Sequence, residues 1–352
     1  MKIATLIVAA MLFVGCNGEN SYDGANGLLS TKAPLNAELS SLYKLYKSDA
    51  NASVSALEEL QSSLEIFEIS ANEASLSALQ EGFKEAVLAH KRVEALFVAD
   101  EFSDDFLDTL GYMEYFHVGK NSDMIGELDA IFAASTPLSS ALYKNANKSI
   151  TSLEYTLFGE DENTSTLLLK MDARRIEAAG IMLARVISHA KSIRDFYNND
   201  ASFEASVKVS SAAMINQLID SAYKLKEWRV GEAAGLVVKY AGATDAKLLE
   251  YYKSQNSLEA IKTIAQAHQS LMQTGLSAIA TSANAASEAE AIENSLASII
   301  TLCESFEAPL EQSLGDAKTT QLYNAINVLQ QNYIALINSM KFTQKIIEAD
   351  GD

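Results

Sequence analysis

The sequence contains little cysteine, proline or glycine: 2 Cys, 3 Pro and 16 Gly in 352 residues. So few Gly and Pro exclude a collagen-like or low-complexity chain, and two Cys exclude a disulfide scaffold, a cysteine-rich zinc module and an iron–sulfur protein. Basic residues are also scarce, with 27 Lys and Arg against 46 Asp and Glu, and the formal net charge is −19. Because phosphate backbones are bound by concentrated Lys and Arg, we expect no nucleic-acid partner.

The N-terminus has the pattern of an export signal. Lys2 precedes an apolar run that ends at Val14 and is too short to span a bilayer as a mature helix. The segment Phe13-Val14-Gly15-Cys16 resembles a bacterial lipobox, in which Cys16 is lipidated, although Phe13 replaces the usual Leu. The alternative is an ordinary secretory signal with an incidental Cys. We expect residues 1–15 to be a signal peptide and residues 16–36, rich in Gly, Asn and Ser, to be a flexible lipid-anchored tether.

From about Ala37 onward the apolar residues recur at helical spacing, stepping by three and four along the chain. No β-branched alternation bounded by turn residues predicts a sheet. The sequence therefore predicts an all-α fold of two four-helix-bundle-like halves, covering residues 37–199 and 200–352. Cys303 lies in an apolar stretch and is expected to be buried. Three patterns predict helix starts: Ser55 to Glu58, Asn256 to Glu259, and Thr136-Pro137.

Several ionisable residues fall on apolar helix faces, where a charge needs a partner or a metal to offset its desolvation. Glu154 lies in the middle of an apolar stripe, with Thr151 at the edge of the stripe. Glu114 and His117 form a Glu-x-x-His pattern on the face of Leu107, Leu110 and Met113, and a third helix carries His90 and Glu94. If these helices are neighbours, three Glu and two His converge inside the N-terminal half. We predict a metal site from Glu154, Glu114, His117 and Glu94.

Each residue also has a structural interpretation. A carboxylate-bridged di-iron bundle needs Glu-x-x-His twice, and the pattern occurs once here. Glu154 could instead accept hydrogen bonds from an Arg side chain, and His90 could be a hydrogen-bonded core histidine. His189 and His268 have no acidic partner at ligand spacing. The catalytic motifs of zincins, α/β-hydrolases and P-loop enzymes are missing. The Arg side chains considered for Glu154 are Arg92, Arg174 and Arg175.

The segment from Ser149 to Gly159 resembles a decayed form of the imelysin family motif, Gly-x-His-x-x-Glu followed by an apolar run and Gly. The motif Glu corresponds to Glu154, the motif His to Thr151 and the motif Gly to Ser149. A Thr cannot replace imidazole as a ligand to a soft or borderline metal, although its hydroxyl could help to hold a hard one. Three further segments also resemble the family: Arg92-Val93-Glu94, Tyr112 to Gly119, and Lys226 to Gly235 with Arg229.

The resemblance implies an exported, often lipid-anchored protein of the bacterial envelope, periplasmic or outer-membrane-anchored, that is associated with acquisition of iron or another divalent metal. It also implies a partner protein in a metal-uptake system. The family was named for a metallopeptidase, but the departures at Ser149 and Thr151 weaken that assignment for this chain. The expected function is non-enzymatic binding of a metal or a metal carrier. The alternatives are an envelope scaffold with a decayed site and a metallopeptidase. His90, Arg92 and Arg229 are expected to support the site.

Overall fold

The computed structural model describes residues 35–117, 123–160, 163–200 and 202–345. The predicted signal peptide, Cys16 and nearly all of the predicted tether lie outside this range. Every element in these residues is helical, and none of them lies in a strand, which confirms the all-α prediction. None of the helices in the described residues is long and apolar enough to cross a membrane.

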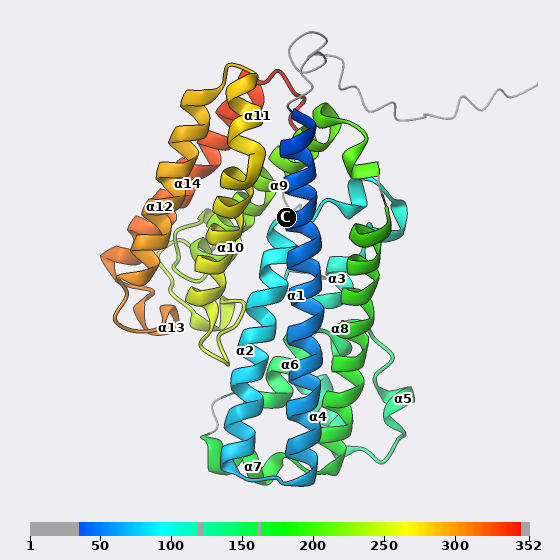
Figure 1. The fold of residues 1–352 in the computed structure, drawn as a ribbon. Coiled ribbons are helices and arrows are strands. Elements are labelled where there is room, and N and C mark those ends of the chain that lie inside the picture. Colours follow the sequence, from blue (N-terminus) through cyan, green and yellow to red (C-terminus); the bar gives the residue numbers. More distant parts are fainter. Residues whose placement is uncertain (1–34, 118–122, 161–162, 201, 346–352) are drawn as a thin grey trace, which may run out of the picture.

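The N-terminal half packs three long helices and one short one. Helix α1 (Leu35–Ile69) contacts α2 (Glu73–Ala95) and α8 (Ala173–Asn199), and α6 (Ile150–Phe158) packs against both α2 and α8. Figure 1 shows α1, α2 and α8 running side by side along this half. Shorter helices connect them: α3 (Thr109–Met113), α4 (Met124–Ala133), α5 (Leu138–Ala141) and α7 (Thr164–Lys170).

The C-terminal half is a second bundle. Its main helices are α9 (Val207–Lys226), α10 (Ser257–Leu271), α12 (Ala286–Glu304) and α14 (Ala317–Ser339), with α14 packed between α9 and α12. Cys303 on α12 is buried, as predicted. The shorter elements of the two halves are the helices α11 (Ser277–Ser282) and α13 (Leu310–Ser313), the π turns Glu227–Gly231 and Met272–Leu276, and the 3₁₀ turns Ala99–Glu101, Asp104–Phe106, Ala146–Lys148, Ser202–Glu204, Val238–Tyr240 and Ala246–Leu248.

The two bundles lie side by side, with α10 against α2 and the π turn Met272–Leu276 against α1. Gly275 in that turn permits the close approach, because a Cβ there would lie 3.0 Å from the carbonyl oxygen of Glu38. A segment from the C-terminal half also reaches α6, since Ser254 bonds to Glu154. The interface between the bundles is therefore where polar side chains of both halves meet.

The helix start predicted at Ser55 is wrong, because α1 continues through that residue without a break. A capping box contributes about 1 kcal/mol, whereas one buried apolar side chain contributes about 2 kcal/mol or more. Pro137 is the N-cap of α5, not its first helical residue, and Asn256 is the N-cap of α10 without a side-chain capping bond. The buried stripe that keeps α1 continuous is Leu39, Leu42, Tyr46, Ala50, Val54, Leu57, Leu60, Leu64 and Phe67.

Candidate functional site

Helix α6 carries the motif-like segment and is fixed at both ends. Ser149 is the N-cap, and its hydroxyl accepts the Ser152 amide hydrogen at 3.3 Å. At the other end the buried Arg175 guanidinium donates to the carbonyl oxygens of Thr156 and Tyr155, each at 2.9 Å. Arg175 adds a donor to the last turn of the helix, where the Tyr155 carbonyl also accepts the Gly159 amide at 2.9 Å, and its charge opposes the negative end of the helix dipole.

Glu154 on α6 is fully buried and faces the C-terminal half. Its Oε1 accepts the backbone amide of Ser254 at 3.0 Å and the Ser254 hydroxyl at 2.7 Å. Its Oε2 has no hydrogen-bond partner among the described residues and lies 3.8 Å from Nζ of Lys253. Burial raises the pKa of Glu154 to about 7, although Lys253 and the bonds from Ser254 act in the opposite direction. The donors to Glu154 are thus the amide and hydroxyl of Ser254, and not the Arg side chain of the alternative interpretation.

Glu114 does not share a helix face with His117, because α3 ends at Met113 and Glu114 has extended backbone. The hydroxyl of Thr151 donates to Oε1 of Glu114, and the Tyr251 hydroxyl donates to Oε2 at 2.7 Å. Burial raises the pKa of Glu114 to about 6. The Thr that replaces the motif His thus binds a carboxylate of the neighbouring segment, and both oxygens of that carboxylate are occupied.

His117 takes a left-handed backbone conformation, with φ of 57°. Its ring stacks on Trp228 at a centroid distance of 4.6 Å and an interplanar angle of 7°. Its Nε2 lies 3.2 Å from Oε2 of Glu232. Trp228 and Glu232 belong to the C-terminal half, so His117 is positioned between the two bundles and not beside Glu114 on one helix.

A buried network of four charges, here called the ion network, joins the two bundles. It consists of Lys91 and Glu94 on α2 together with Arg229 and Glu250 of the C-terminal half. Arg229 Nη2 lies 2.5 Å from Glu94 Oε1, and Arg229 Nε lies 2.7 Å from Glu250 Oε2. Lys91 Nζ donates to both carboxylates, and its side chain has no exposed surface. Burial alone would raise the pKa of Glu94, but Lys91 and Arg229 hold that pKa below its usual range.

Five further residues named in the sequence analysis lie outside the ion network. His90 is fully buried, and neither ring nitrogen has a hydrogen-bond partner among the described residues; burial lowers its pKa to about 4. Arg92 pairs with Asp49 at 2.9 Å. His268 is held by the hydroxyls of Ser221 and Tyr333, at 2.9 and 3.1 Å. His189 contacts the Tyr112 ring, and Arg174 donates to the carbonyls of Ile131 and Thr136.

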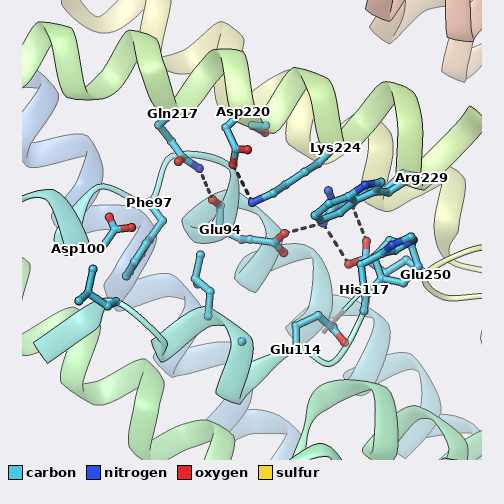
Figure 2. A pocket seen from close by; sticks show the side chains of 16 residues that line it. Glu94, Phe97, Asp100, Glu114, His117, Gln217, Asp220, Lys224, Arg229 and Glu250 are labelled. Carbon is cyan, nitrogen blue, oxygen red and sulfur yellow. Dashed lines mark hydrogen bonds and ion pairs between the residues drawn. The ribbon is translucent and has the colours of Figure 1, made fainter. Parts of the chain in front are cut away.

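Two adjoining cavities open at the interface, and together they are called the interface cleft here. The first, about 270 Å³, is lined by Glu94, Glu114, Trp228 and Arg229, and Figure 2 shows the bonds from Glu94 and Glu250 to Arg229 at its wall. The second, about 380 Å³, is lined by Tyr115, Thr151, Tyr252 and Lys253. Phe116, His117 and Glu250 line both. Tyr155 and Phe158 line neither, since Tyr155 bonds to Asp129 and Phe158 packs on Phe83.

The sequence-based expectation that five side chains converge inside the N-terminal half is wrong. Glu94, Glu114 and Glu154 each bond to a residue of the C-terminal half, so they line the interface between the bundles. Within the residues that the structure describes, no group of three or more His, Cys, Asp or Glu side chains is placed to hold a metal ion. Ligation of a metal by Glu94, Glu114, His117 and Glu154 stays a prediction, and all four side chains already have partners within the protein.

The residues of the C-terminal half that bond to Glu94, Glu114 and Glu154 could not be predicted from the sequence. Glu250, Tyr251, Lys253 and Ser254 lie in a segment without helical periodicity, and no local pattern marks them as buried. Trp228 was within the third family-like segment, next to Arg229, and is the one Trp of the sequence. The position of Trp228 next to Arg229 in the sequence is the one feature that could have predicted that Trp228 lies at the site.

The raised pKa of Glu154 predicts a pH dependence of stability. The folded state keeps a proton up to about pH 7, whereas the unfolded chain releases it near its ordinary value, so stability falls as pH rises between these values. Glu154→Gln removes this titration. The stability of the variant relative to wild type should therefore be about 2 kcal/mol more favourable at pH 7.5 than at pH 5 in denaturant unfolding. A relative stability that is equal at both pH values contradicts this assignment.

Comparison with known proteins gives a family and a fold. The family model described as Imelysin matches residues 46–336. An imelysin-like protein from Psychrobacter arcticum 273-4 has a similar structure, with a TM-score of 0.67 and 15% identity over 90% of this chain and 99% of that one. A protein of Parabacteroides distasonis ATCC 8503, provisionally named an iron-regulated protein A precursor, aligns with a TM-score of 0.68 and 13% identity over 90% and 98% of the two chains. No curated protein matches.

Proposed function

The chain belongs to the imelysin family, and we propose that it is an exported, lipid-anchored protein of the bacterial cell envelope that binds an iron carrier in its interface cleft without catalysing a reaction. The carrier is a small organic molecule that holds iron. The name of the Parabacteroides relative supports a role connected with iron. The protein would pass the carrier, or its iron, to a partner in an uptake system.

One observation carries the choice of a carrier over a bare ion. The carboxylates of the site already bind groups of the protein, because Glu94 pairs with Lys91 and Arg229, and Glu114 accepts from Thr151 and Tyr251. A free cation would have to displace these donors and then lie near two buried positive charges. Such an ion would compete poorly, since removing one partner of a buried ion pair costs about 3–5 kcal/mol.

The size of the interface cleft also supports an organic ligand. Its two cavities measure about 270 and 380 Å³, and small-molecule sites in proteins range from about 300 to 1,000 Å³. Tyr115, Phe116 and Trp228 contribute aromatic surface to the lining, as is common in such sites. Tyr155 and Phe158 pack elsewhere, and Tyr115 lines the second cavity without closing it. An open cleft favours a binding protein over a scaffold with a decayed site.

Trp228 lines the first cavity and is the one Trp of the chain, so its fluorescence reports directly on the cleft. Titration with ferric citrate and with the ferric complex of 2,3-dihydroxybenzoate should quench its emission saturably. Iron should also remain with the protein in equilibrium dialysis. N-acetyltryptophanamide titrated in parallel corrects for light absorbed by the complexes. Quenching no greater than that of the free fluorophore, together with no retained iron, contradicts the proposed function.

Lipid anchoring at Cys16 gives an independent prediction. The full chain expressed in a bacterial host should incorporate labelled palmitate and sediment with membranes, because two or more acyl chains hold a protein to a bilayer stably. Cys16→Ala should abolish both the label and the sedimentation. Cys303→Ala is the matched control, because that thiol is buried on α12 and should leave both unchanged. Membrane association that persists in Cys16→Ala argues against the anchor.

A further inference from the structure

Lys253 is a nearly buried cation that faces the second cavity of the interface cleft. Its side chain is 4% exposed, and it belongs to the lining of that cavity. Its Nζ forms no hydrogen bond with the residues that the structure describes; its nearest contacts are the Tyr252 ring, 4.0 Å away, and Oε2 of Glu154, 3.8 Å away. A lysine ammonium has three N–H donors, so Nζ can donate to a ligand in this cavity.

The other charged groups around this cavity already have partners. Glu232 pairs with His117, Glu250 is bound by Lys91 and Arg229, and Asp123 accepts the Gly126 amide at the start of α4. Lys247 pairs with Glu160. These contacts do not cancel every carboxylate charge, because Asp123 bonds a neutral amide and Glu232 meets an imidazole. Among the charged side chains described around this cavity, Lys253 differs in that its Nζ forms no hydrogen bond and its ion pair with Glu154 is 3.8 Å long.

Glu154 does not compensate Lys253 fully. Its Oε1 is occupied by Ser254, and the remaining oxygen is beyond hydrogen-bond distance from Nζ. Nζ of Lys253 is therefore a local anchor for an anionic group, in a chain that carries a net charge of −19.

Apolar side chains line the second cavity around Lys253. Phe116, Tyr252, Leu248 and Leu249 line the same cavity. Burying such surface against a ligand is favourable by about 25 cal/mol for each Å² removed from water. A small inorganic anion covers little of this surface, whereas an organic anion with a planar or branched carbon body covers more.

We propose that Lys253 is the anchoring cation for the carboxylate of a carbon-rich organic anion, which occupies the second cavity of the interface cleft. This inference rests on the proposed function, because it specifies the chemical class of the carrier. The carboxylate would accept a charge-assisted hydrogen bond from Nζ, and the carbon body would lie against the aromatic and aliphatic walls. No residue of the imelysin-like motif is required to contact the ligand directly.

Calorimetric titration of the intact protein with iron-free 2,3-dihydroxybenzoate tests the inference. Wild type should bind it, and Lys253→Met, which keeps the length of the side chain, should bind it at least about tenfold more weakly, because a hydrogen bond to a charged group contributes about 1.5–3 kcal/mol. Lys253→Arg should stay within about threefold of wild type. Lys239→Met is the matched control, since Lys239 is exposed beside Tyr240 and outside the lining.

A second measurement needs no variant. The methyl ester of the same acid keeps the ring and hydroxyls but loses the negative charge, and it should bind wild type at least about tenfold more weakly than the acid. Equal affinity for acid and ester, or equal affinity of Lys253→Met and wild type, overturns the inference. If wild type binds ferric carriers but not the iron-free anion, the inference fails and the proposed function stands. If wild type binds neither, both fail.

Discussion

Glu250→Gln is expected to lower the free energy of unfolding by about 3–5 kcal/mol, which is the cost of breaking a buried ion pair. Glu250 compensates both Lys91 and Arg229, at 2.5 and 2.7 Å, and all three side chains are at most 5% exposed. The neutral amide keeps the shape of the side chain but leaves two buried cations with only Glu94. Since Lys91 lies on α2 and Arg229 in the other bundle, the loss should loosen the interface between the bundles.

Guanidinium denaturation followed by circular dichroism measures this effect. Glu259→Gln is the matched control, because Glu259 forms an exposed pair with Lys262 and its loss should cost less than about 1 kcal/mol. The double variant Lys91→Met/Glu250→Gln should recover part of the stability, since it removes one of the unpaired cations. A Glu250→Gln protein as stable as the control would mean that the ion network does not join the bundles.

Arg175→Met is expected to have the second large effect, lowering the free energy of unfolding by about 2–4 kcal/mol. Arg175 donates two buried hydrogen bonds, both of 2.9 Å, to the last turn of α6. A hydrogen bond to a charged group contributes about 1.5–3 kcal/mol. The substitution removes the Arg175 donor from the Thr156 carbonyl and leaves the Tyr155 carbonyl with the Gly159 amide alone. Without these bonds the end of α6, the helix that carries Glu154, should also be less protected from exchange. Amide hydrogen exchange of Leu157 and Phe158 should therefore accelerate.

The partly exposed Arg194 provides the control, since within the described residues its ion pair is with the neighbouring Asp195. Arg194→Met should change the free energy of unfolding by less than about 1 kcal/mol. If Arg175→Met is no less stable than Arg194→Met, then α6 is held by its packing against α2 and α8, not by the guanidinium.

The helices could be predicted because their signal is local and repeated. On α14, Leu322, Ile326 and Leu329 recur at the spacing that buries one face, and all three are fully buried. The start predicted at Ser55 was wrong for a physical reason. The capping signal there is one short pattern, and it competes with an apolar stripe that runs along the whole of α1.

The site could be predicted only in part, because its contacts join residues that are distant in sequence. The apolar neighbours of Glu154 correctly predicted that its side chain is buried. Its partner Ser254, however, lies 100 residues away in the sequence. The helical pattern suggested that Glu114 and His117 share a face. The chain instead leaves the helix after Met113, where Thr151 and the Tyr115 amide bond to the Glu114 carboxylate. No local pattern contains that information.

Anaerobic calorimetry with ferrous ion, beside ferric citrate under the same conditions, tests the central claim that the interface cleft takes a carrier and not a free ion. The account predicts saturable binding of the carrier and no one-to-one binding of the free ion, because the carboxylates of the site are held by Lys91, Arg229, Thr151 and Tyr251. One-to-one binding of ferrous ion that is lost when Glu154, Glu114 and His117 are replaced by Ala would contradict it.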